Sequence, residues 1–310
     1  MPITGLHLLL TYQCNFECDH CFVNSRPEAK GVMKISDIKQ ILAEAKTVGN
    51  VKWIYFEGGE PFLYYQIMLW GLRAAKDYNF NGGIVTNAYW ATSVKDAREW
   101  LTPISEIGIS DLSISDDAYH YDESEENLAK NAYKAAKDLE LPVDKIVIED
   151  PKECFKKIEW KGKPVVEGRV LFKGRAAEKL VEGLPRKPWI EFDKCLDEDF
   201  SNQSRAHIDP FGYVHVCQGI SIGNMKKTPL HVLLTVFDPE THPICGPILR
   251  GGPAELVREY KVGHEEKYVD ACHLCYFTRL NLREKFPEVL APNQMYDSNV
   301  DMGTCGRRDS

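Results

Sequence analysis

The chain has 310 residues, of which 44% are hydrophobic and 27% are charged, and its formal net charge is −8 at pH 7. These values are typical of a globular protein with a full core and exclude a chain too polar to fold. The acidic balance argues against a nucleic-acid partner, which would require a basic stripe. No apolar run approaches the roughly 20 residues of a membrane span and no secretory signal is recognisable, so we expect a cytoplasmic protein without a membrane partner.

Strand-like and helix-like segments alternate through the first half of the chain. Apolar or alternating patterns predict six strands, at residues 6–11, 53–56, 83–86, within 107–115, at 145–148 and at 165–172. Helical spacing and capping residues predict helices at 36–47, 65–76, 93–100 and 124–139, with Ser36 and Ser124 as caps. These units predict a parallel sheet covered by helices, in an open or barrel-like arrangement. The chemistry of such folds lies at the carboxyl ends of the strands.

The alternation stops near residues 184–188, where we place a boundary between domains at 1–188 and 189–310. Two alternating runs at 206–208 and 213–217 flank the turn residues Asp209-Pro210-Phe211-Gly212 and predict a β-hairpin. We therefore expect the second part to be a small α+β domain.

Three of the ten cysteines, Cys14, Cys18 and Cys21, follow the first predicted strand with the spacing C-x3-C-x2-C. This spacing is so tight that one loop must hold all three sulfurs. Iron–sulfur cubanes are normally held by four thiolates, so a loop with three leaves one iron open, and open metal positions mark reactive sites. The alternative is a zinc site with His20 or a distant residue as the fourth ligand.

The C-x3-C-x2-C loop resembles the signature of the radical S-adenosylmethionine (SAM) superfamily, with His20 at a position that is usually aromatic. Its second element is Gly58-Gly59-Glu60-Pro61, which matches the family's Gly-Gly-Glu turn after the second strand. The resemblance covers about the first 180 residues and implies a partial (β/α)6 TIM-like barrel. It also implies that a [4Fe-4S] cluster on the three cysteines binds SAM, whose amino group is held by the glycine-rich turn.

Further polar residues stand at the ends of the third and fourth predicted strands and resemble the family's SAM contacts. They are Thr86, Asn87, Ser113, Ser115 and Asp116. Helix capping is the alternative role for them. For Arg175 we expect a pairing with the SAM carboxylate or an anionic substrate, with a surface ion pair as the alternative, whereas for Arg169 the surface ion pair is preferred. The aromatic residues Trp53, Tyr55 and Phe56 are assigned to the core, and His207 and His215 to structural roles.

A second set of cysteines resembles the auxiliary-cluster extension of radical SAM enzymes. It consists of Cys195, Cys217, Cys272 and Cys275. The single-cluster twitch form fits better than the SPASM form, because no dense cysteine run follows Cys275. By this resemblance the four thiolates hold a second [4Fe-4S] cluster that is closed to substrate. Zinc bound by the same residues is the alternative, and Cys245 and Cys305 are alternative ligands.

The resemblance implies an enzyme that reductively cleaves SAM to a 5′-deoxyadenosyl radical, which takes a hydrogen atom from a substrate. Flavodoxin or ferredoxin is the implied reductant. A second cluster suits an oxidative modification, and we expect a small molecule such as a polyol, an aminosugar or an amino acid. A peptide-modifying maturase of the RiPP type is the first alternative. A non-catalytic iron–sulfur or zinc protein is the second, although it has no use for the Gly58–Pro61 turn.

Overall fold

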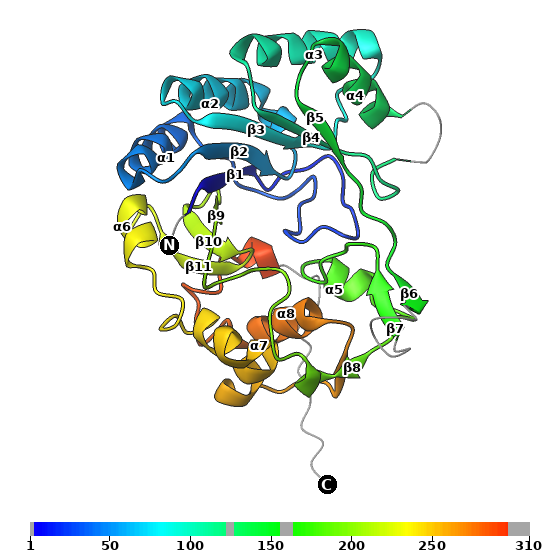
Figure 1. The fold of residues 1–310 in the computed structure, drawn as a ribbon, viewed down its shortest axis with the longest axis vertical. Coiled ribbons are helices and arrows are strands. Elements are labelled where there is room, and N and C mark those ends of the chain that lie inside the picture. Colours follow the sequence, from blue (N-terminus) through cyan, green and yellow to red (C-terminus); the bar gives the residue numbers. More distant parts are fainter. Residues whose placement is uncertain (1–2, 122–126, 156–163, 297–310) are drawn as a thin grey trace.

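The computed structural model describes residues 3–121, 127–155 and 164–296, and its centre is a sheet of eight strands (Figure 1). In spatial order these are β11 (Ile220–Asn224), β10 (Tyr213–Cys217), β9 (Arg205–Ile208), β1 (Gly5–Thr11), β2 (Trp53–Gly58), β3 (Asn81–Thr86), β4 (Asp111–Ser115) and β5 (Val143–Ile146). The six strands from β9 to β5 are parallel to one another. Strand β10 pairs antiparallel with both of its neighbours, β9 and β11. Two small antiparallel sheets pair β6 (Lys152–Phe155) with β7 (Pro164–Glu167), and β8 (Lys187–Pro188) with β12 (Lys267–Tyr268).

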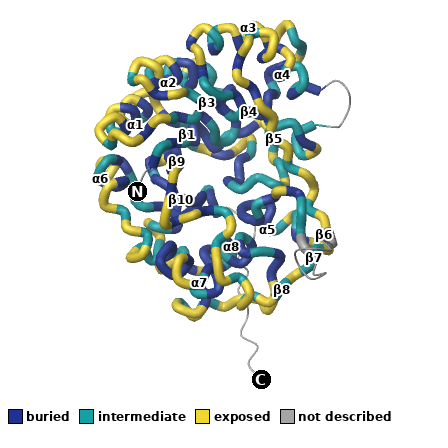
Figure 2. The backbone as a smooth tube through the Cα atoms, viewed as in Figure 1, coloured by how far each residue is buried: buried dark blue, intermediate teal, exposed yellow. Residues whose placement is uncertain are grey.

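Four helices cover one face of the parallel strands (Figures 1 and 2): α1 (Ile35–Val48), α2 (Tyr65–Asp77), α3 (Val94–Ile107) and α4 (Leu128–Asp138). Leu6, Leu8 and Leu10 of β1 are buried in the core beneath these helices. Because side chains alternate along a strand, His7 and Leu9 face the opposite side of the sheet. That opposite, concave side holds the candidate site.

The remaining helices pack in the second half of the chain. They are α5 (Ala176–Lys179), α6 (Leu230–Val236), α7 (Cys245–Tyr260) and α8 (Ala271–Leu282), with 3-10 turns at Trp189–Glu191 and Asn293–Tyr296. A further 3-10 turn, Pro61–Tyr64, precedes α2 in the first half. Helix α6 lies beside α1, whereas α7 and α8 form a separate layer (Figure 1). Their apolar core is shared with Leu9 of β1 and Val216 of β10. Within the described residues, no helix combines the length and apolarity that crossing a membrane requires.

The predicted α/β class with a partial parallel barrel is confirmed, but the sixth strand was placed wrongly. Residues 165–172 do not join the large sheet, because only β7 is a strand there and it pairs with β6. The sixth parallel strand is β9, the first arm of the predicted hairpin, which lies beside β1 with His207 opposite His7. The hairpin itself is confirmed by the antiparallel pairing of β9 with β10. The sheet thus runs across the predicted boundary at Pro188, and the division into two domains stays a prediction.

Two helix starts and one strand also differ from the prediction. Helix α4 begins at Leu128 because the Asn127 side chain accepts a hydrogen bond from the backbone N–H of Lys130, and Ser124 lies outside the described residues. Helix α1 begins at Ile35, one residue before the predicted Ser36 cap. Strand β5 lies two residues earlier than predicted, at Val143–Ile146.

The turn after β2 is locked against the loop that follows β1. The backbone N–H of Gly59 donates to the carbonyl of Thr11 at 2.7 Å, and that of Glu60 donates to the carbonyl of Gln13 at 2.9 Å. A Cβ at position 59 would lie 2.0 Å from the Gln13 carbonyl oxygen. Glycine is therefore required here by the close approach of two backbones.

The carboxylate of Glu60 joins this turn to the end of β3. It is fully buried and accepts hydrogen bonds from the backbone N–H of Phe62, the hydroxyl of Thr86 and the backbone N–H of Asn87. Burial raises the pKa of Glu60 to about 7, although these three donors oppose the shift. One side chain thus fixes the positions of two strand ends.

We expect Gly59→Ala to lower the free energy of unfolding by ~1–3 kcal/mol or more, since this range is the usual cost of overpacking. The added Cβ would meet backbone atoms of Tyr12 and Gln13, which cannot move aside as the end of a flexible side chain can. Urea unfolding of the reduced chain measures this. Gly263→Ala is the matched control, since nothing lies within 4 Å of a Cβ there. Equal stability of the two variants would contradict the backbone contact.

We expect Glu60→Gln to destabilise the protein by about 1–3 kcal/mol at pH 5, because the amide N–H group would face backbone donors. The folded pKa of about 7 lies above the ordinary value of 4.5. The stability that comes from protonating Glu60 is therefore complete below about pH 4.5 and is lost as pH rises through 7. The deficit of the variant should shrink between pH 5 and pH 8, by up to about 1.4 kcal/mol per unit of pKa shift.

Urea unfolding at the two pH values tests this prediction. Glu284→Gln, at an exposed position, is the control for the loss of one carboxylate. A Glu60→Gln deficit that is independent of pH would show that Glu60 does not titrate in this range.

Candidate functional site

A cavity of about 470 Å³ opens on the concave side of the parallel strands. It brings together ten of the predicted site residues: Cys14, Cys18, Cys21, Gly58, Gly59, Thr86, Asn87, Ser113, Ser115 and Arg175. They come from the loop after β1, the ends of β2, β3 and β4, and the segment before α5. Residues from five separate parts of the sequence therefore share one wall.

The three cysteines of the loop are held near one another in the cavity wall. Cys14 is buried, and Cys18 and Cys21 are half-buried. The sulfur of Cys14 accepts from the backbone N–H of Phe16 at 3.4 Å and from the Asn87 side-chain amide at 3.5 Å. That of Cys21 accepts from the backbone N–H of Ser25 at 3.3 Å. Such donors stabilise thiolates, the form that ligates metals.

Burial raises the pKa of both Cys14 and Cys18 to about 12. These thiols are therefore unfavourable as free thiolates, and a bound metal centre would supply the missing positive charge. Four thiolates around one zinc ion would lie about 3.8 Å apart, given a Zn–S distance of about 2.3 Å. Among the described residues, no cysteine belongs to a group of three ligand atoms within 4.8 Å of one another. The wider spacing fits a multi-iron cluster better than a single ion.

Arg175 holds the cysteine loop closed. Its guanidinium donates to the carbonyl of Cys18 at 2.9 Å and to the carbonyl of Ser25 at 2.6 Å. Its backbone N–H donates to the carbonyl of Cys21 at 3.1 Å. Arg175 therefore fixes the loop as well as lining the cavity, and a pairing with a SAM carboxylate stays a prediction.

Three predicted contacts do not line the cavity: Glu60, Pro61 and Asp116. The Glu60 carboxylate is fully engaged by Phe62, Thr86 and Asn87. Pro61 is buried at the start of its 3-10 turn. Asp116 accepts from the Asn127 amide at 3.0 Å and from the Lys145 ammonium at 2.6 Å. In this arrangement, any influence of these residues on a bound molecule is exerted through their neighbours.

His20 lies in a cluster with His120 and Asp117, whose ligand atoms are within 4.8 Å of one another. The ring of His120 hydrogen-bonds to Asp117 at 2.8 Å. Burial and the neighbouring His120 lower the pKa of His20 to about 4, so its ring stays neutral. His20 thus serves as an uncharged ring against Tyr119, which explains why it is tolerated at a position that is usually aromatic.

Strands β1, β2 and β4 also carry into the cavity polar residues that the sequence analysis missed, among them His7, Tyr55, Glu57 and Asp111, which form a second wall. The assignment of Tyr55 to the core was wrong, because β2 turns Ile54 and Phe56 to the core and Tyr55 to the cavity. Side chains alternate between the two faces of a strand, so the sequence of β2 already indicated that Tyr55 and its neighbours Ile54 and Phe56 face opposite sides. Arg169 also lines the cavity, so its preferred assignment to a surface ion pair missed this position.

His7, Glu57 and His207 meet at this wall across three neighbouring strands. His7 Nδ1 lies 2.9 Å from Glu57 Oε2, and His207 Nε2 lies 3.5 Å from Glu57 Oε1. Burial alone would raise the pKa of Glu57, but the His7 ring lowers it to about 2. Burial lowers the pKa of His207 to about 3. An ionised carboxylate is thus held between two imidazoles, and the imidazole of His207 is neutral.

The second set of predicted cysteines also meets in one place. Cys195, Cys217, Cys272 and Cys275 line a small cavity between the hairpin and helices α7 and α8, together with Lys173 and Arg279. Burial raises the pKa of Cys195, Cys272 and Cys275. Cys245 is buried nearby but does not line this cavity, and Cys305 lies outside the described residues. The identity of the ligands stays a prediction.

Comparisons with known proteins address the family. Residues 8–181 match the model of the radical SAM superfamily. YydG of Bacillus subtilis, a protein named for peptide biosynthesis, is 26% identical over 144 residues, which are 46% of this chain and 45% of that protein. A Pyrococcus furiosus protein named as a modifier of the cofactor of tungsten-containing aldehyde ferredoxin oxidoreductase is 32% identical over 105 residues, 34% of this chain and 28% of that one. The chain thus spans less than half the length of these curated relatives.

Two solved structures are similar at low identity. BtrN in complex with AdoMet and 2-DOIA has a TM-score of 0.48 and 17% identity, over 74% of this chain and 81% of that one. Streptococcus suis SuiB bound to S-adenosylmethionine has a TM-score of 0.38 and 15% identity, over 75% of this chain and 65% of that one. We draw nothing about substrate from these similarities. The family match covers more than half of the chain and includes the cysteine loop and the Gly58–Gly59 turn, and the chain therefore belongs to the radical SAM superfamily.

Proposed function

We propose that the protein is an enzyme that cleaves SAM reductively and removes a hydrogen atom from a small organic molecule, as part of an oxidative modification. The observation that carries the proposal is the position of the three-cysteine loop and the Gly58–Gly59 turn on the wall of one 470 Å³ cavity. Membership of the superfamily implies a [4Fe-4S] cluster and SAM. The donor set fits this group, because three thiolates leave one of four irons open.

When bound, the cluster supplies the electron that splits SAM into methionine and a 5′-deoxyadenosyl radical. The chain's own residues have other tasks. Arg175 keeps the cysteine loop closed through the carbonyls of Cys18 and Ser25, and Asn87 donates to the sulfur of Cys14. Buried apolar residues such as Leu9 and Val23 also line the cavity and help to keep water away from a reactive intermediate.

We assign the substrate to the wall formed by His7, Tyr55, Glu57 and Asp111, called the substrate wall. Hydroxyl and amino groups find both donors and acceptors there. The cavity must hold the cluster and SAM as well as the substrate, so its volume of about 470 Å³ favours a small substrate over a large one. A polyol, an aminosugar or an amino acid has the right chemistry.

We further propose that Cys195, Cys217, Cys272 and Cys275 hold an auxiliary [4Fe-4S] cluster in a twitch-like domain at 189–310. A cluster with four protein thiolates is closed to substrate and suits electron transfer. Such a cluster would accept the electron that the substrate radical loses when it is oxidised, after the hydrogen atom has been removed. Flavodoxin or ferredoxin is the proposed source of the electron for SAM.

The second candidate function is peptide modification. It is favoured by the similarity to YydG, a protein named for peptide biosynthesis, over 144 residues. A short precursor-peptide reading frame beside the gene would support this candidate. Genes for sugar or amino-acid enzymes would support the small-molecule reading.

We expect the triple substitution of Cys14, Cys18 and Cys21 by alanine to abolish SAM cleavage and to lower the iron content from about eight to about four per chain, because the auxiliary cubane remains. Iron analysis after anaerobic reconstitution and detection of 5′-deoxyadenosine after reduction measure both effects. Cys245→Ala is the control and should keep about eight irons, since Cys245 lines neither cysteine cavity. Persistent cleavage by the triple variant would show that the cluster is elsewhere.

We expect Cys272→Ala together with Cys275→Ala to remove the second cluster only. Iron should fall to about four per chain, while SAM cleavage in the absence of substrate persists, because the first cavity is intact. The same iron and product analyses apply. About four irons and one zinc in the wild type would identify the second site as a zinc site and would refute the auxiliary cluster.

A further inference from the structure

Two buried cations line the cavity of the auxiliary cysteines. They are Lys173, which is 2% exposed, and Arg279, which is 1% exposed. Burying a charged side chain is costly unless an opposite charge or several hydrogen bonds compensate. The surroundings of both residues therefore show which charges this site is built to hold.

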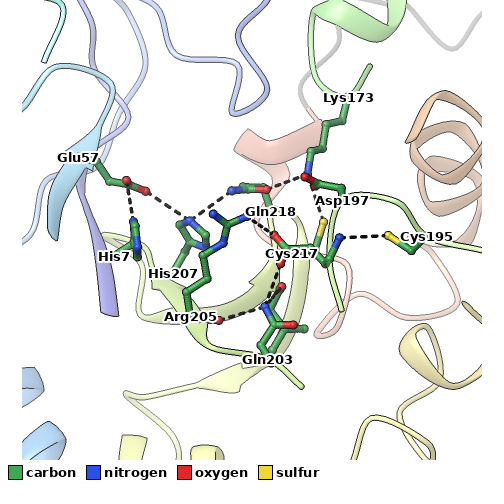
Figure 3. Close-up of polar contacts among 12 residues, drawn as sticks. His7, Glu57, Lys173, Cys195, Asp197, Gln203, Arg205, His207, Cys217 and Gln218 are labelled. Atoms are coloured by element: carbon green, nitrogen blue, oxygen red, sulfur yellow. Dashed lines mark hydrogen bonds and ion pairs between the residues drawn. The ribbon is translucent and has the colours of Figure 1, made fainter. Parts of the chain in front are cut away.

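Lys173 donates to three groups around it (Figure 3). Its ammonium lies 2.6 Å from Asp197 Oδ2, 3.0 Å from Gln218 Oε1 and 3.4 Å from Cys217 Sγ. Lys173 and Asp197 form an ion pair, and their side chains are only 2% and 14% exposed. The side chain is therefore a fixed positive charge in direct contact with one of the four sulfurs.

Arg279 adds a second positive charge. It donates to the carbonyl of Gln218 at 2.9 Å and to the hydroxyl of Tyr296 at 3.3 Å, both of which are neutral. Among the described residues, no carboxylate forms an ion pair with Arg279. Its Nε also donates to the carbonyl of Cys275 at 3.4 Å, and its side chain lines the same cavity as the four cysteines. The cavity lining thus holds two cations and one carboxylate, Asp197, and Asp270 caps the start of α8 beside it. The two cations suit an anionic group with thiolate ligands.

Lys173 is also the first member of a chain of polar side chains. This chain reaches the substrate wall of the 470 Å³ cavity, here called the main cavity. The chain consists of Lys173, Gln218, His207, Glu57 and His7 (Figure 3). The Gln218 amide nitrogen lies 3.3 Å from His207 Nε2, and His207 is linked through Glu57 to His7. The positive charge therefore lies on the side of the auxiliary site that faces the main cavity.

We propose that Lys173 is a positioning residue that raises the reduction potential of the auxiliary cluster and so makes that cluster an electron acceptor rather than a purely structural element. A positive charge and an N–H donor to a ligating sulfur both stabilise the more negative, reduced state. This inference rests on the proposed second cluster. It adds that the reduction potential of that cluster is raised and that Lys173 is the residue that raises it.

The test measures the midpoint potential of the auxiliary cluster, not catalysis. The full chain carrying alanine at positions 14, 18 and 21 is reconstituted anaerobically, so that one cluster contributes to an EPR-monitored redox titration. Lys173→Met, Lys173→Arg and Lys227→Met are compared in this background. Lys227 is exposed and pairs with Glu288, so it controls for the loss of one lysine charge far from the site.

We expect Lys173→Met to lower the equilibrium constant for reduction at least tenfold, a shift of about 59 mV for one electron. Lys173→Arg should keep most of the wild-type potential, and Lys227→Met all of it. Loss of iron from Lys173→Met would show that Lys173 is needed to hold the cluster and would overturn the proposal that it tunes the potential. An unchanged potential in Lys173→Met, or an equal change in Lys173→Arg, would overturn it.

The result also separates this inference from the proposed function. A wild-type chain without auxiliary iron would refute the second cluster and the role of Lys173 together. Four auxiliary irons whose potential does not respond to Lys173→Met would refute the role of Lys173 alone.

Discussion

The buried carboxylate of Glu60 is the interaction on which the candidate site depends. It gathers donors from its own turn and from the end of β3, while the adjacent Gly59 is pressed against the loop that carries the cysteines. Three strand ends are thereby fixed relative to one another. An ionised carboxylate is costly to bury. The burial of Glu60 is therefore unfavourable by itself, and what Glu60 contributes is the fixed position of the groups that donate to it.

The second structural element is the pairing of β9 with β1, which joins the two halves of the chain in one sheet. This pairing sets His207 beside His7 and carries Gln218 to the back of the substrate wall. The auxiliary cysteines are therefore neighbours of the main cavity and are connected to it by side chains (Figure 3). The main cavity and the auxiliary cysteines are formed by residues far apart in sequence, and the polar chain from Lys173 to His7 joins them. A transfer of electrons between the two sites would require such closeness.

The sequence allowed the local parts of this arrangement to be predicted, because their determinants are local. The spacing of Cys14, Cys18 and Cys21 requires one loop, and the Gly58–Pro61 turn requires a close backbone approach. The substrate wall was missed because His7, Glu57 and His207 come from strands whose order in the sheet cannot be deduced from periodicity. The same limit explains the misplaced sixth strand. Lys173 was missed because a lysine in a sequence is expected at the surface, and only the packed structure shows it buried.

The place of β1 in the sheet has a consequence for biosynthesis. Its neighbours are β2, which follows within about 60 residues of the N-terminus, and β9, which begins at Arg205. While the ribosome is still making the intervening segment, one edge of β1 has no native partner, and unpaired edges invite wrong associations. The cysteine loop can thus form before β9, the strand that pairs with the other edge of β1, has been made.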